Sequence, residues 1–282
     1  MSELIWINGE IMPLGDARIG VEDRGFQFAD GVYEVVRIYN GKAFTLDAHL
    51  QRLAKSAESI EIKLPVSGTQ LRGEIVKFIA RNPLADGMIY LQLTRGAAPR
   101  NHAFPDCKPT LLFYARALDP LGDPAKSQGV RLITVTDERW KRCWIKSIAL
   151  LPNVLAKNKA LAAGADEAVF IDDGVVTECS SSNIFIIRGR RLLTHAVGPK
   201  VLPGITRAVL LELAPTTGLS VGEESFSEDE AIHADEVFIT STTREISWVL
   251  QWNQIPIDSG KCGPHTLALH EALRKRIAAE TA

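Results

Sequence analysis

One polar, proline-containing segment near the middle of the chain limits how the sequence can fold. Residues 119–128 (DPLGDPAKSQ) contain two prolines and few apolar residues, which is typical of an exposed connection between domains. Strand and helix patterns occur on both sides of this segment. The sequence therefore predicts an α+β protein with two domains, residues 1–118 and residues 129–282, joined by a linker at residues 119–128.

The first half of the sequence predicts a sheet accompanied by helices. Asn8-Gly9 is a strong two-residue turn signal, and it predicts a hairpin over residues 4–14. Residues 22–31 contain two glycines and are expected to form a loop, whereas the β-branched and aromatic residues of 32–39 predict a strand. Further expected elements are a helix from Asp47, a helix over residues 67–82, and strands at residues 87–96 and 109–118.

The second half predicts the same mixture of elements. A helix over residues 152–163 should end before Gly164, because glycine readily takes the left-handed conformation that follows many helices. The other expected strands are residues 129–136, 167–171, 175–177, 183–187, 236–240 and 245–252, and the other expected helices are residues 204–214, 227–233 and 263–280.

Composition argues against several functional classes. The chain has 282 residues and a net charge of −2 without a long basic run, so nucleic-acid binding is not expected. No apolar run approaches the length of a membrane span, and the N-terminus lacks the pattern of a signal peptide. Four cysteines without a C-x-x-C pair and six scattered histidines predict reduced thiols in the cytoplasm and no structural metal.

Lys146 is a candidate for covalent chemistry. It lies in the apolar part of residues 137–152, where apolar neighbours disfavour the charged form of a lysine. A neutral amine is what Schiff-base chemistry requires. The simpler interpretation is a lysine that extends from a half-buried strand into solvent. Local chemistry alone does not separate Lys146 from Lys141, Lys157 or Lys159.

Two segments carry side chains that could bind charged groups of a ligand. Residues 177–183 (TECSSSN) place Glu178 and three serines between two expected strands, where the acid could hold a positive charge and the serines anionic oxygens. Arg100 and His102 lie in a loop between two other expected strands, and an arginine matches a carboxylate in bidentate geometry. An ordinary turn and a solvated loop are the alternative interpretations.

Three further segments could bind a phosphate. Ile205 and Thr206 lie at the expected start of a helix, where free N–H groups attract anions. Ser241 and Thr242 belong to a run of four hydroxyl residues that ends a strand, and Arg52 could add a positive charge. Each pattern is also typical of an ordinary helix start, strand end or solvated helix face. A phosphate site therefore requires several of them to converge.

Taken in order, these segments resemble the fold-type IV pyridoxal-phosphate aminotransferases, and most closely the bacterial D-amino acid aminotransferases. The Arg-x-His pattern of residues 100–102 points to the D-amino acid branch. The similarity covers nearly the whole chain and runs through residues 22–36, 49–53, 94–102, 142–147, 155–157, 177–183, 204–207 and 240–243.

The resemblance implies pyridoxal 5′-phosphate as the cofactor and a role for each candidate. Lys146 would hold the cofactor as a Schiff base and then carry the α-proton of the substrate, and Glu178 would pair with the pyridine nitrogen. The other residues expected to bind the cofactor are Arg52, Ile205, Thr206, Ser241 and Thr242. The residues expected to bind the substrate α-carboxylate are Tyr33, Arg100 and His102.

The resemblance also implies a particular architecture. It predicts a smaller N-terminal α+β domain and a larger C-terminal barrel-like domain, with the cofactor between them. It further predicts a homodimer with the active site at the subunit interface, in which Arg100 and His102 serve the neighbouring subunit. Residues 119–128 fall where the boundary between the two domains is expected.

The implied reaction is transfer of the amino group of a D-amino acid, such as D-alanine, to 2-oxoglutarate or pyruvate. A D- and an L-amino acid can present the same Cα–H if carboxylate and side chain exchange places, so the position of the carboxylate-binding residues decides handedness. Alternatives on the same fold are a branched-chain L-amino acid transaminase, an (R)-amine transaminase and an aminodeoxychorismate lyase. A binding module that has kept the fold is a further alternative.

Overall fold

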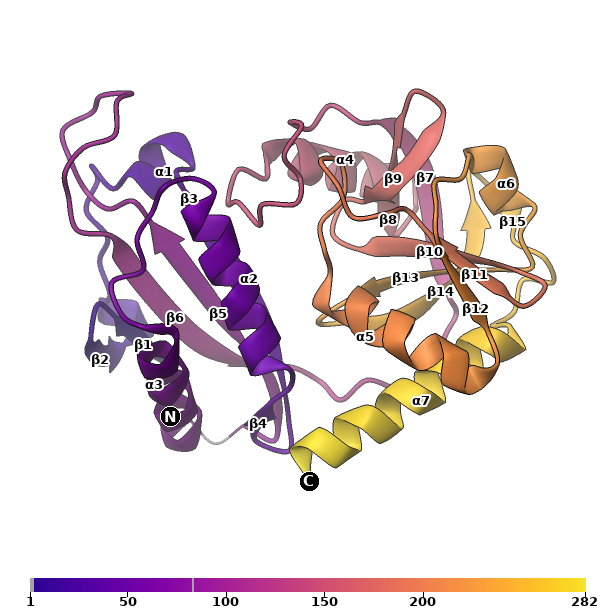
Figure 1. The fold of residues 1–282 in the computed structure, drawn as a ribbon, viewed down its shortest axis with the longest axis horizontal. Helices are drawn as coiled ribbons and strands as arrows, with labels where there is room; N and C mark the ends of the chain where they lie inside the picture. Colours follow the sequence, from indigo (N-terminus) through magenta and orange to yellow (C-terminus); the bar gives the residue numbers. More distant parts are fainter. Residues whose placement is uncertain (1–2, 83) are drawn as a thin grey trace. The chain divides into compact units, whose positions relative to one another are not determined.

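The computed structural model describes residues 3–82 and 84–282, and the chain forms two compact units (Figure 1). The first comprises Met1–Pro120, Ile145–Ala149 and Glu280–Ala282, and the second comprises Leu121–Trp144 and Leu150–Ala279. Compactness alone does not establish that a unit folds independently, so the domains 1–118 and 129–282 with their linker stay a prediction.

The first unit contains a six-stranded antiparallel sheet in the order β2-β1-β6-β5-β3-β4. The predicted hairpin is confirmed, because Asn8-Gly9 joins β1 to β2 with positive φ at both residues. The strands are β1 (Leu4–Ile7), β2 (Glu10–Pro13), β3 (Gly31–Tyr39), β4 (Lys42–Ala43), β5 (Asp86–Thr94) and β6 (Thr110–Ala117). The helices are α1 (Arg24–Phe28), α2 (Leu46–Glu58) and α3 (Gly68–Arg81), with a 3-10 turn at Leu14–Asp16.

Helices α2 and α3 cover one face of this sheet (Figure 1). Glu34, Leu91 and Phe113 lie opposite one another on β3, β5 and β6 and so share a face. Arg52 of α2 contacts Glu34, and the ring of Phe78 of α3 packs edge-on against Phe113 with centroids 5.2 Å apart. Burial of a side chain such as Phe78 stabilises the fold by about 1.5–3 kcal/mol.

Helix α1 departs from the prediction of a loop at residues 22–31. It has five residues, too few to show a helical period in the sequence. The Asp23 side chain caps it by accepting a hydrogen bond from Gly25 N at 2.8 Å. Ala29 ends it in the left-handed conformation. The cap and the left-handed residue turn the chain into β3.

The second unit contains a nine-stranded mixed sheet, in the order β12-β11-β10-β13-β14-β7-β8-β9 with β15 beside β14. The strands are β7 (Val130–Thr136), β8 (Glu167–Asp172), β9 (Val175–Cys179), β10 (Asn183–Arg188), β11 (Arg191–Thr194), β12 (Ser220–Glu223), β13 (Glu236–Ser241), β14 (Glu245–Trp252) and β15 (Ile255–Pro256). The helices are α4 (Leu151–Ala162), α5 (Ile205–Leu213), α6 (Glu228–Ile232) and α7 (Pro264–Thr281), with 3-10 turns at Pro124–Lys126 and Ala214–Thr217.

The parallel pairs of this sheet explain where its helices lie. β7 pairs parallel with β8 across α4, and β11 pairs parallel with β12 across α5, since parallel neighbours need a crossover connection. Gly164 follows α4 with φ of 72°, which confirms the predicted helix end. The sequence did not predict β11 or β12, whose four residues each are too few for a clear alternation.

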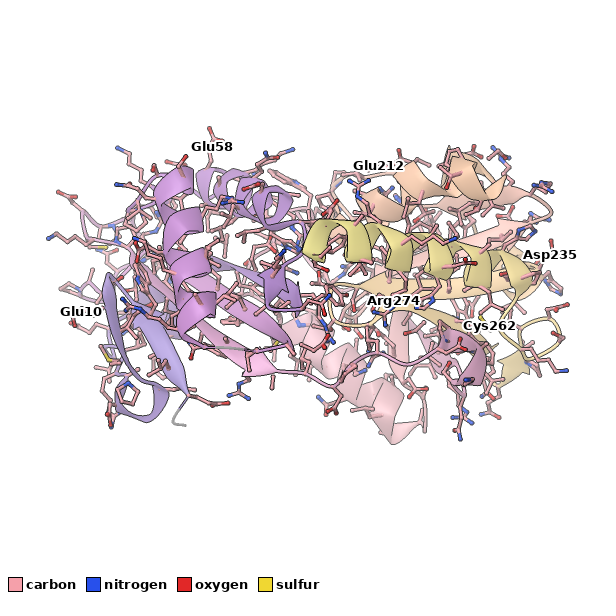
Figure 2. The ribbon with its side chains drawn as sticks, turned by 90° about the horizontal axis from the view of Figure 1, so that it is seen from below. Glu10, Glu58, Glu212, Asp235, Cys262 and Arg274 are labelled. Atoms are coloured by element: carbon pink, nitrogen blue, oxygen red, sulfur yellow. The ribbon has the colours of Figure 1, made fainter. Side chains whose placement is uncertain are left out.

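Buried side chains join α7 to the strands of the second unit. Figure 2 shows Arg274 on this helix, and its Nε lies 3.1 Å from Glu245 Oε2 at the start of β14. The carboxylate of Glu236 accepts hydrogen bonds from His265 N and Thr266 N at 2.9 and 2.7 Å. Glu236 thereby satisfies donors in the first turn of the helix, which otherwise have no partner inside it.

Candidate functional site

Lys146 lies in a short extended segment beside β3. Tyr33 N donates to Lys146 O at 3.0 Å, and Val32 is opposite Ser147. Since side chains alternate along paired strands, Lys146 and Tyr33 share the opposite face. The Lys146 amine lies 4.3 Å from the centroid of the Tyr33 ring. The structure therefore brings together two of the predicted site residues.

Three buried polar side chains on α2 lie toward β3 and the Lys146 segment. His49, Arg52 and Ser56 follow at helical spacing, and all three are buried. Ser56 Oγ accepts a hydrogen bond from Lys146 N at 3.2 Å. Arg52 donates from Nε and Nη2 to the two carboxylate oxygens of Glu34, at 2.7 and 2.8 Å. The orientation of Arg52 is therefore fixed by a bidentate ion pair.

Glu34 is a residue of this site that the sequence analysis missed. Burial would raise the pKa of Glu34, but the charge and hydrogen bonds of Arg52, with a hydrogen bond from His49, lower it to about 2. Burial lowers the pKa of His49 despite its contact with Glu34, so its imidazole is neutral at neutral pH. The available signal was a single acid among the apolar residues on one face of the expected strand, since a buried charge needs a partner.

Arg100 and His102 contact one aromatic ring. The guanidinium carbon of Arg100 lies 4.7 Å from the centroid of the Phe28 ring at the end of α1. The imidazole of His102 lies 5.4 Å from the same centroid, at an interplanar angle of 51°. The two predicted ligands of the substrate carboxylate therefore lie together on a shared apolar support.

Glu178 is buried at the end of β9 and is held through both carboxylate oxygens. Oε1 accepts from Arg139 Nη1, and Oε2 accepts from Leu202 N at 3.0 Å and from Asn183 Nδ2 at 3.2 Å. Arg139 also pairs with Asp137 at 2.7 Å. Burial would lower the pKa of Arg139, but the hydrogen bonds to Asp137 and the charge of Glu178 raise it above its usual value. The sequence analysis did not identify Arg139, which lies in the polar part of residues 137–152.

Ile205 and Thr206 form the first turn of α5, as expected. The helix begins after Gly204, which has no side chain to cap the first N–H groups of the helix. A Cβ at Gly204 would lie 2.0 Å from Asn183 Oδ1. Asn183 also donates to Glu178, so the helix start and the buried carboxylate are neighbours.

The three serines at residues 180–182 bind anionic oxygens, as predicted for a ligand. These oxygens belong to the carboxylate of Glu167 in the same chain. Ser181 donates to Glu167 Oε1 from its backbone N at 2.6 Å and from Oγ at 2.8 Å. The hydroxyls of Ser180 and Ser182 donate to the same carboxylate at 3.4 and 3.2 Å. Glu167 is fully buried on β8, so these bonds offset the cost of its charge and hold the turn after Glu178 in place.

Ser241 and Thr242 lie where β13 ends and turns toward β14. Just before them, Thr240 is opposite Asn183 of β10, so the two side chains share a face of the sheet. The Thr240 hydroxyl is buried and has no hydrogen-bond partner within residues 3–82 and 84–282. A buried hydroxyl without a partner is unfavourable, so a ligand oxygen bound beside Asn183 would be stabilised there.

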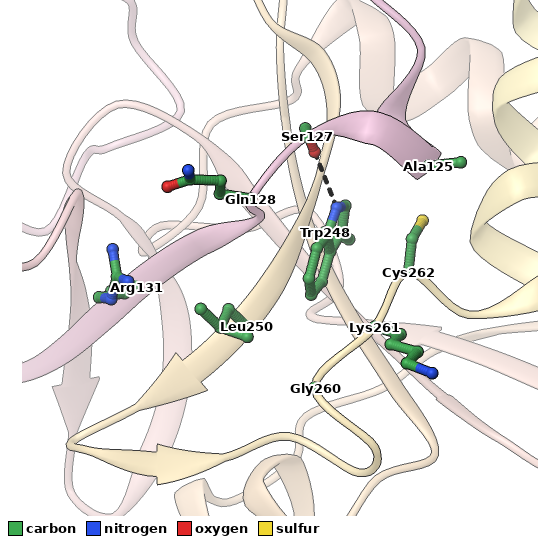
Figure 3. A pocket seen from close by; sticks show the side chains of 9 residues that line it. All are labelled: Ala125, Ser127, Gln128, Arg131, Trp248, Leu250, Gly260, Lys261 and Cys262. Atoms are coloured by element: carbon green, nitrogen blue, oxygen red, sulfur yellow. Dashed lines mark hydrogen bonds between the residues drawn. The ribbon is translucent and has the colours of Figure 1, made fainter.

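The second unit also carries a pocket of about 520 Å³ that does not contain the predicted site residues (Figure 3). Trp248 Nε1 in this pocket already donates to Ser127 Oγ at 2.8 Å and to Pro124 O at 3.0 Å. Figure 3 shows Arg131 and Lys261 on opposite sides of the Trp248 ring, so they do not converge on one ligand group. The lining residues are Ala125, Ser127, Gln128, Arg131, Trp248, Leu250, Gly260, Lys261 and Cys262.

Residues 3–82 and 84–282 contain neither a cluster of metal-binding side chains nor a membrane-spanning helix. There, no three or more His, Cys, Asp or Glu side chains are grouped to hold a metal ion. No helix among the described residues has both the length and the apolar character of a membrane span. All four cysteines are free, and burial raises the pKa of Cys143 to about 11.

The fold and these residues define an aminotransferase of class IV. Residues 31–252 match the family described as Amino-transferase class IV. The chain is 44% identical over 281 residues to the D-alanine aminotransferase of Bacillus licheniformis, covering 99% of this chain and 98% of that protein. The chain therefore belongs to the class IV aminotransferases.

Solved structures agree with this assignment and confirm the predicted fold type IV. The branched-chain amino acid aminotransferase of Escherichia coli superposes with a TM-score of 0.92 at 26% identity, covering 100% of this chain and 97% of that chain. A second branched-chain amino acid aminotransferase, solved with pyridoxamine 5′-phosphate, gives a TM-score of 0.91 at 29% identity, covering 99% and 95%. The protein is a pyridoxal-phosphate-dependent aminotransferase.

The residues present fit pyridoxal 5′-phosphate in their chemistry. Lys146 offers an amine for the aldehyde, and Glu178 offers a buried carboxylate for the ring nitrogen. The uncapped start of α5 and the buried hydroxyl of Thr240 are suited to phosphate oxygens. When bound, the cofactor supplies an electron sink for the reaction at the substrate Cα.

Proposed function

We propose that the protein is a D-amino acid aminotransferase that transfers the amino group of a D-amino acid, such as D-alanine, to 2-oxoglutarate or pyruvate. The relative in Bacillus licheniformis supports this substrate class, because it is a D-alanine aminotransferase and is 44% identical over nearly the whole chain. The structural observation that carries the proposal is the placement of Arg100 and His102 on the Phe28 ring. Two adjacent cationic or hydrogen-bonding side chains are suited to a carboxylate.

Lys146 is the proposed catalytic residue, which holds the cofactor and moves the α-proton. Its backbone is bound on two sides, by Tyr33 N and by Ser56 Oγ, so that the motion needed for proton transfer is confined to the side chain. Tyr33 lies against the amine and is the proposed third ligand of the substrate carboxylate. Proton transfer by a positioned side chain of this kind typically accelerates a reaction by about 10²–10⁴-fold.

The remaining proposed roles concern the cofactor. Glu178 would pair with the pyridine nitrogen and would keep it protonated, and its own position is fixed by Arg139, Asn183 and Leu202. The side chain of Arg52 is oriented by Glu34 and provides a rigid cation for the phosphate. The proposed phosphate ligands are Arg52, Ile205, Thr206, Ser241 and Thr242.

We also propose a cytoplasmic homodimer in which Arg100 and His102 act in the active site of the neighbouring subunit. Near the same loop, Phe26 and Phe104 are 79% and 57% exposed. Large apolar side chains exposed in this way are typical of a surface that another subunit covers. The four free thiols agree with a reducing compartment.

A substrate panel with spectral monitoring tests this function. The purified protein, incubated with pyridoxal phosphate, should absorb in the visible range, and D-alanine should remove that band. Sustained pyruvate formation from D-alanine should require 2-oxoglutarate. The other donors to compare are D-glutamate, L-leucine, (R)-phenylethylamine and aminodeoxychorismate.

The outcomes of this panel separate the alternatives. If L-leucine reacts faster than every D-amino acid, the branched-chain activity of the structural relatives holds for this chain and the proposal is wrong. Pyruvate released from aminodeoxychorismate without a 2-oxo acid would indicate a lyase. A protein that stays colourless with pyridoxal phosphate would contradict the role of Lys146.

A further inference from the structure

Arg24 is a buried arginine that holds the loop carrying Arg100 and His102. It is 3% exposed, and its Nη1 donates to the carbonyl oxygen of Asn101. Its Nη2 donates to the carbonyl oxygen of His102 at 3.4 Å. The two bonds reach across more than seventy residues of sequence, from α1 to the loop between β5 and β6. They act on the backbone directly beside both proposed carboxylate ligands.

The Phe28 ring connects Arg24 to the side chain of Arg100 as well. The guanidinium carbons of Arg24 and Arg100 each lie 4.7 Å from the centroid of this ring, and the His102 imidazole is 5.4 Å from it. Two like charges on one ring repel each other unless one of them is neutralised nearby. The structure supplies this neutralisation through Asp30.

Asp30 forms an ion pair with Arg24, so Arg24 does not compete with Arg100 for the substrate carboxylate. Its Oδ2 accepts from Arg24 Nε at 2.8 Å, and its two oxygens accept from Arg95 at 2.7 and 3.0 Å. Burial would raise the pKa of Asp30, but hydrogen bonds from Arg95 and Arg24 hold it below its usual value. All three nitrogens of the Arg24 guanidinium are thus engaged within the protein, whereas the Arg100 guanidinium lies on the Phe28 ring.

We propose that Arg24 is a positioning residue for the substrate carboxylate: by binding the carbonyl oxygens of Asn101 and His102, it fixes Arg100 and His102 in the orientation that selects D-amino acids. The inference rests on the proposed function, since it assumes that these two side chains bind the carboxylate. A bidentate contact depends strongly on the direction of the guanidinium, so a loop free to rotate binds the carboxylate less well.

The test measures kcat and KM of the holoenzyme for D-alanine in the variant Arg24→Lys. Lysine keeps the positive charge beside Asp30 but cannot reach both carbonyl oxygens with a planar fork. KM should rise by about tenfold, while kcat and the cofactor dissociation constant change less than about twofold. Arg24→Lys in an Arg100→Ala background should have a smaller effect on kcat/KM, because one of the two side chains through which Arg24 acts is already absent.

A matched control and a second variant complete the design. Arg18 is exposed and donates to the carbonyl oxygens of Gly15 and Ala17 at 2.7 and 2.8 Å, so Arg18→Lys removes the same kind of contact from another loop and should leave KM unchanged. If Arg24→Lys does not fold, the neutral variant Arg24→Gln, which also lacks the guanidinium that reaches both carbonyl oxygens, should give the same rise in KM.

Each result bears on one proposal. An unchanged KM in the folded Arg24→Lys or Arg24→Gln variant, or the same loss with and without Arg100, would overturn the positioning role of Arg24. A loss of kcat with KM unchanged would do the same. A wild-type enzyme that does not react with D-amino acids would instead contradict the proposed function.

Discussion

At the residue scale, the best-defined group is the amine of Lys146. The backbone of this residue is bound by Tyr33 and by Ser56, while its Nζ lies against the Tyr33 ring. A catalytic amine must reach its target repeatedly from one starting position, and a fixed backbone provides that position. The aromatic ring limits the amine on one side without forming an ion pair with it.

The variant Lys146→Ala should lose measurable turnover, because neither the covalent link nor the proton transfer is then possible. The cofactor should still bind without the visible absorbance of the Schiff base, as followed by absorbance after gel filtration. Lys159→Ala is the control, since Lys159 is exposed on α4. Appreciable turnover in Lys146→Ala would contradict its assigned role.

The variant Glu178→Gln should reduce kcat by about 100-fold or more, because an uncharged side chain no longer keeps the cofactor ring protonated. Arg139 keeps its pair with Asp137, so the local structure should persist, as checked by thermal unfolding. Glu212→Gln removes a charge from an exposed position on α5 (Figure 2) and should leave kcat unchanged. A kcat for Glu178→Gln near that of the wild type would exclude this role for Glu178.

At the scale of elements, each unit has one short backbone feature that positions predicted site residues. One is the pairing of the Lys146 segment with β3, and the other is the close approach of Gly204 to Asn183 at the start of α5. Both depend on backbone contacts rather than on the length of a helix or strand. Lys146 and the start of α5 are therefore held in place by the neighbouring elements.

The variant Gly204→Ala should weaken cofactor binding by about tenfold, because its Cβ would lie 2.0 Å from Asn183 Oδ1 and displace either the helix start or the amide. The dissociation constant of pyridoxal phosphate from the apoenzyme measures this effect. Gly68→Ala is the matched control, since Gly68 begins α3 and a Cβ there would have no described atom within 4 Å outside its own helix and chain neighbours. Equal cofactor affinities in the two variants would show that the contact with Asn183 does not matter.

At the scale of the whole molecule, buried ionised groups make stability depend on pH. The pKa of Glu34 is lowered from its ordinary value of 4.5 to about 2, so its stabilising effect is complete above pH 4.5 and is lost as pH falls toward 2. The shift corresponds to about 3 kcal/mol. The lowered pKa of His49 acts in the same direction, beginning below its ordinary value of 6.5.

The variant Glu34→Gln should therefore have a lower Tm than the wild type at pH 7, and the difference should shrink as pH falls from 5 toward 2. Thermal unfolding across this pH range measures the difference. Glu74→Gln changes a partly exposed acid of α3 and should follow the wild type. A constant difference in Tm at every pH would mean that folding does not lower the pKa of Glu34.

A mixture of two impaired variants tests the proposed dimer. If Arg100 serves the neighbouring subunit, a hybrid of Lys146→Ala and Arg100→Ala subunits contains one site with both residues intact. Random reassociation should restore about a quarter of wild-type activity, since half of the dimers are hybrids with one intact site each. Activity no higher than the sum of the two variants would show that Arg100 acts within its own subunit.

Local patterns in the sequence determined most of the elements and the identity of the main candidates. β-Branched and aromatic residues predicted β3, an apolar stripe predicted α2, and glycine after a helix predicted the end of α4. These signals are local, because each depends on residues a few positions apart. The order of the motifs likewise indicated the family, which the comparison with class IV aminotransferases confirmed.

Only the tertiary structure determined which groups pair with the buried charged side chains. Glu34 meets Arg52, Arg139 meets Glu178, Glu167 meets the three serines, and Arg24 meets the carbonyl oxygens of the Arg100 loop. Each pairing joins different elements, and burial makes a partner necessary without specifying which residue provides it. The sequence thus determined the elements and the candidate chemistry, while packing determined the partners that orient the candidates.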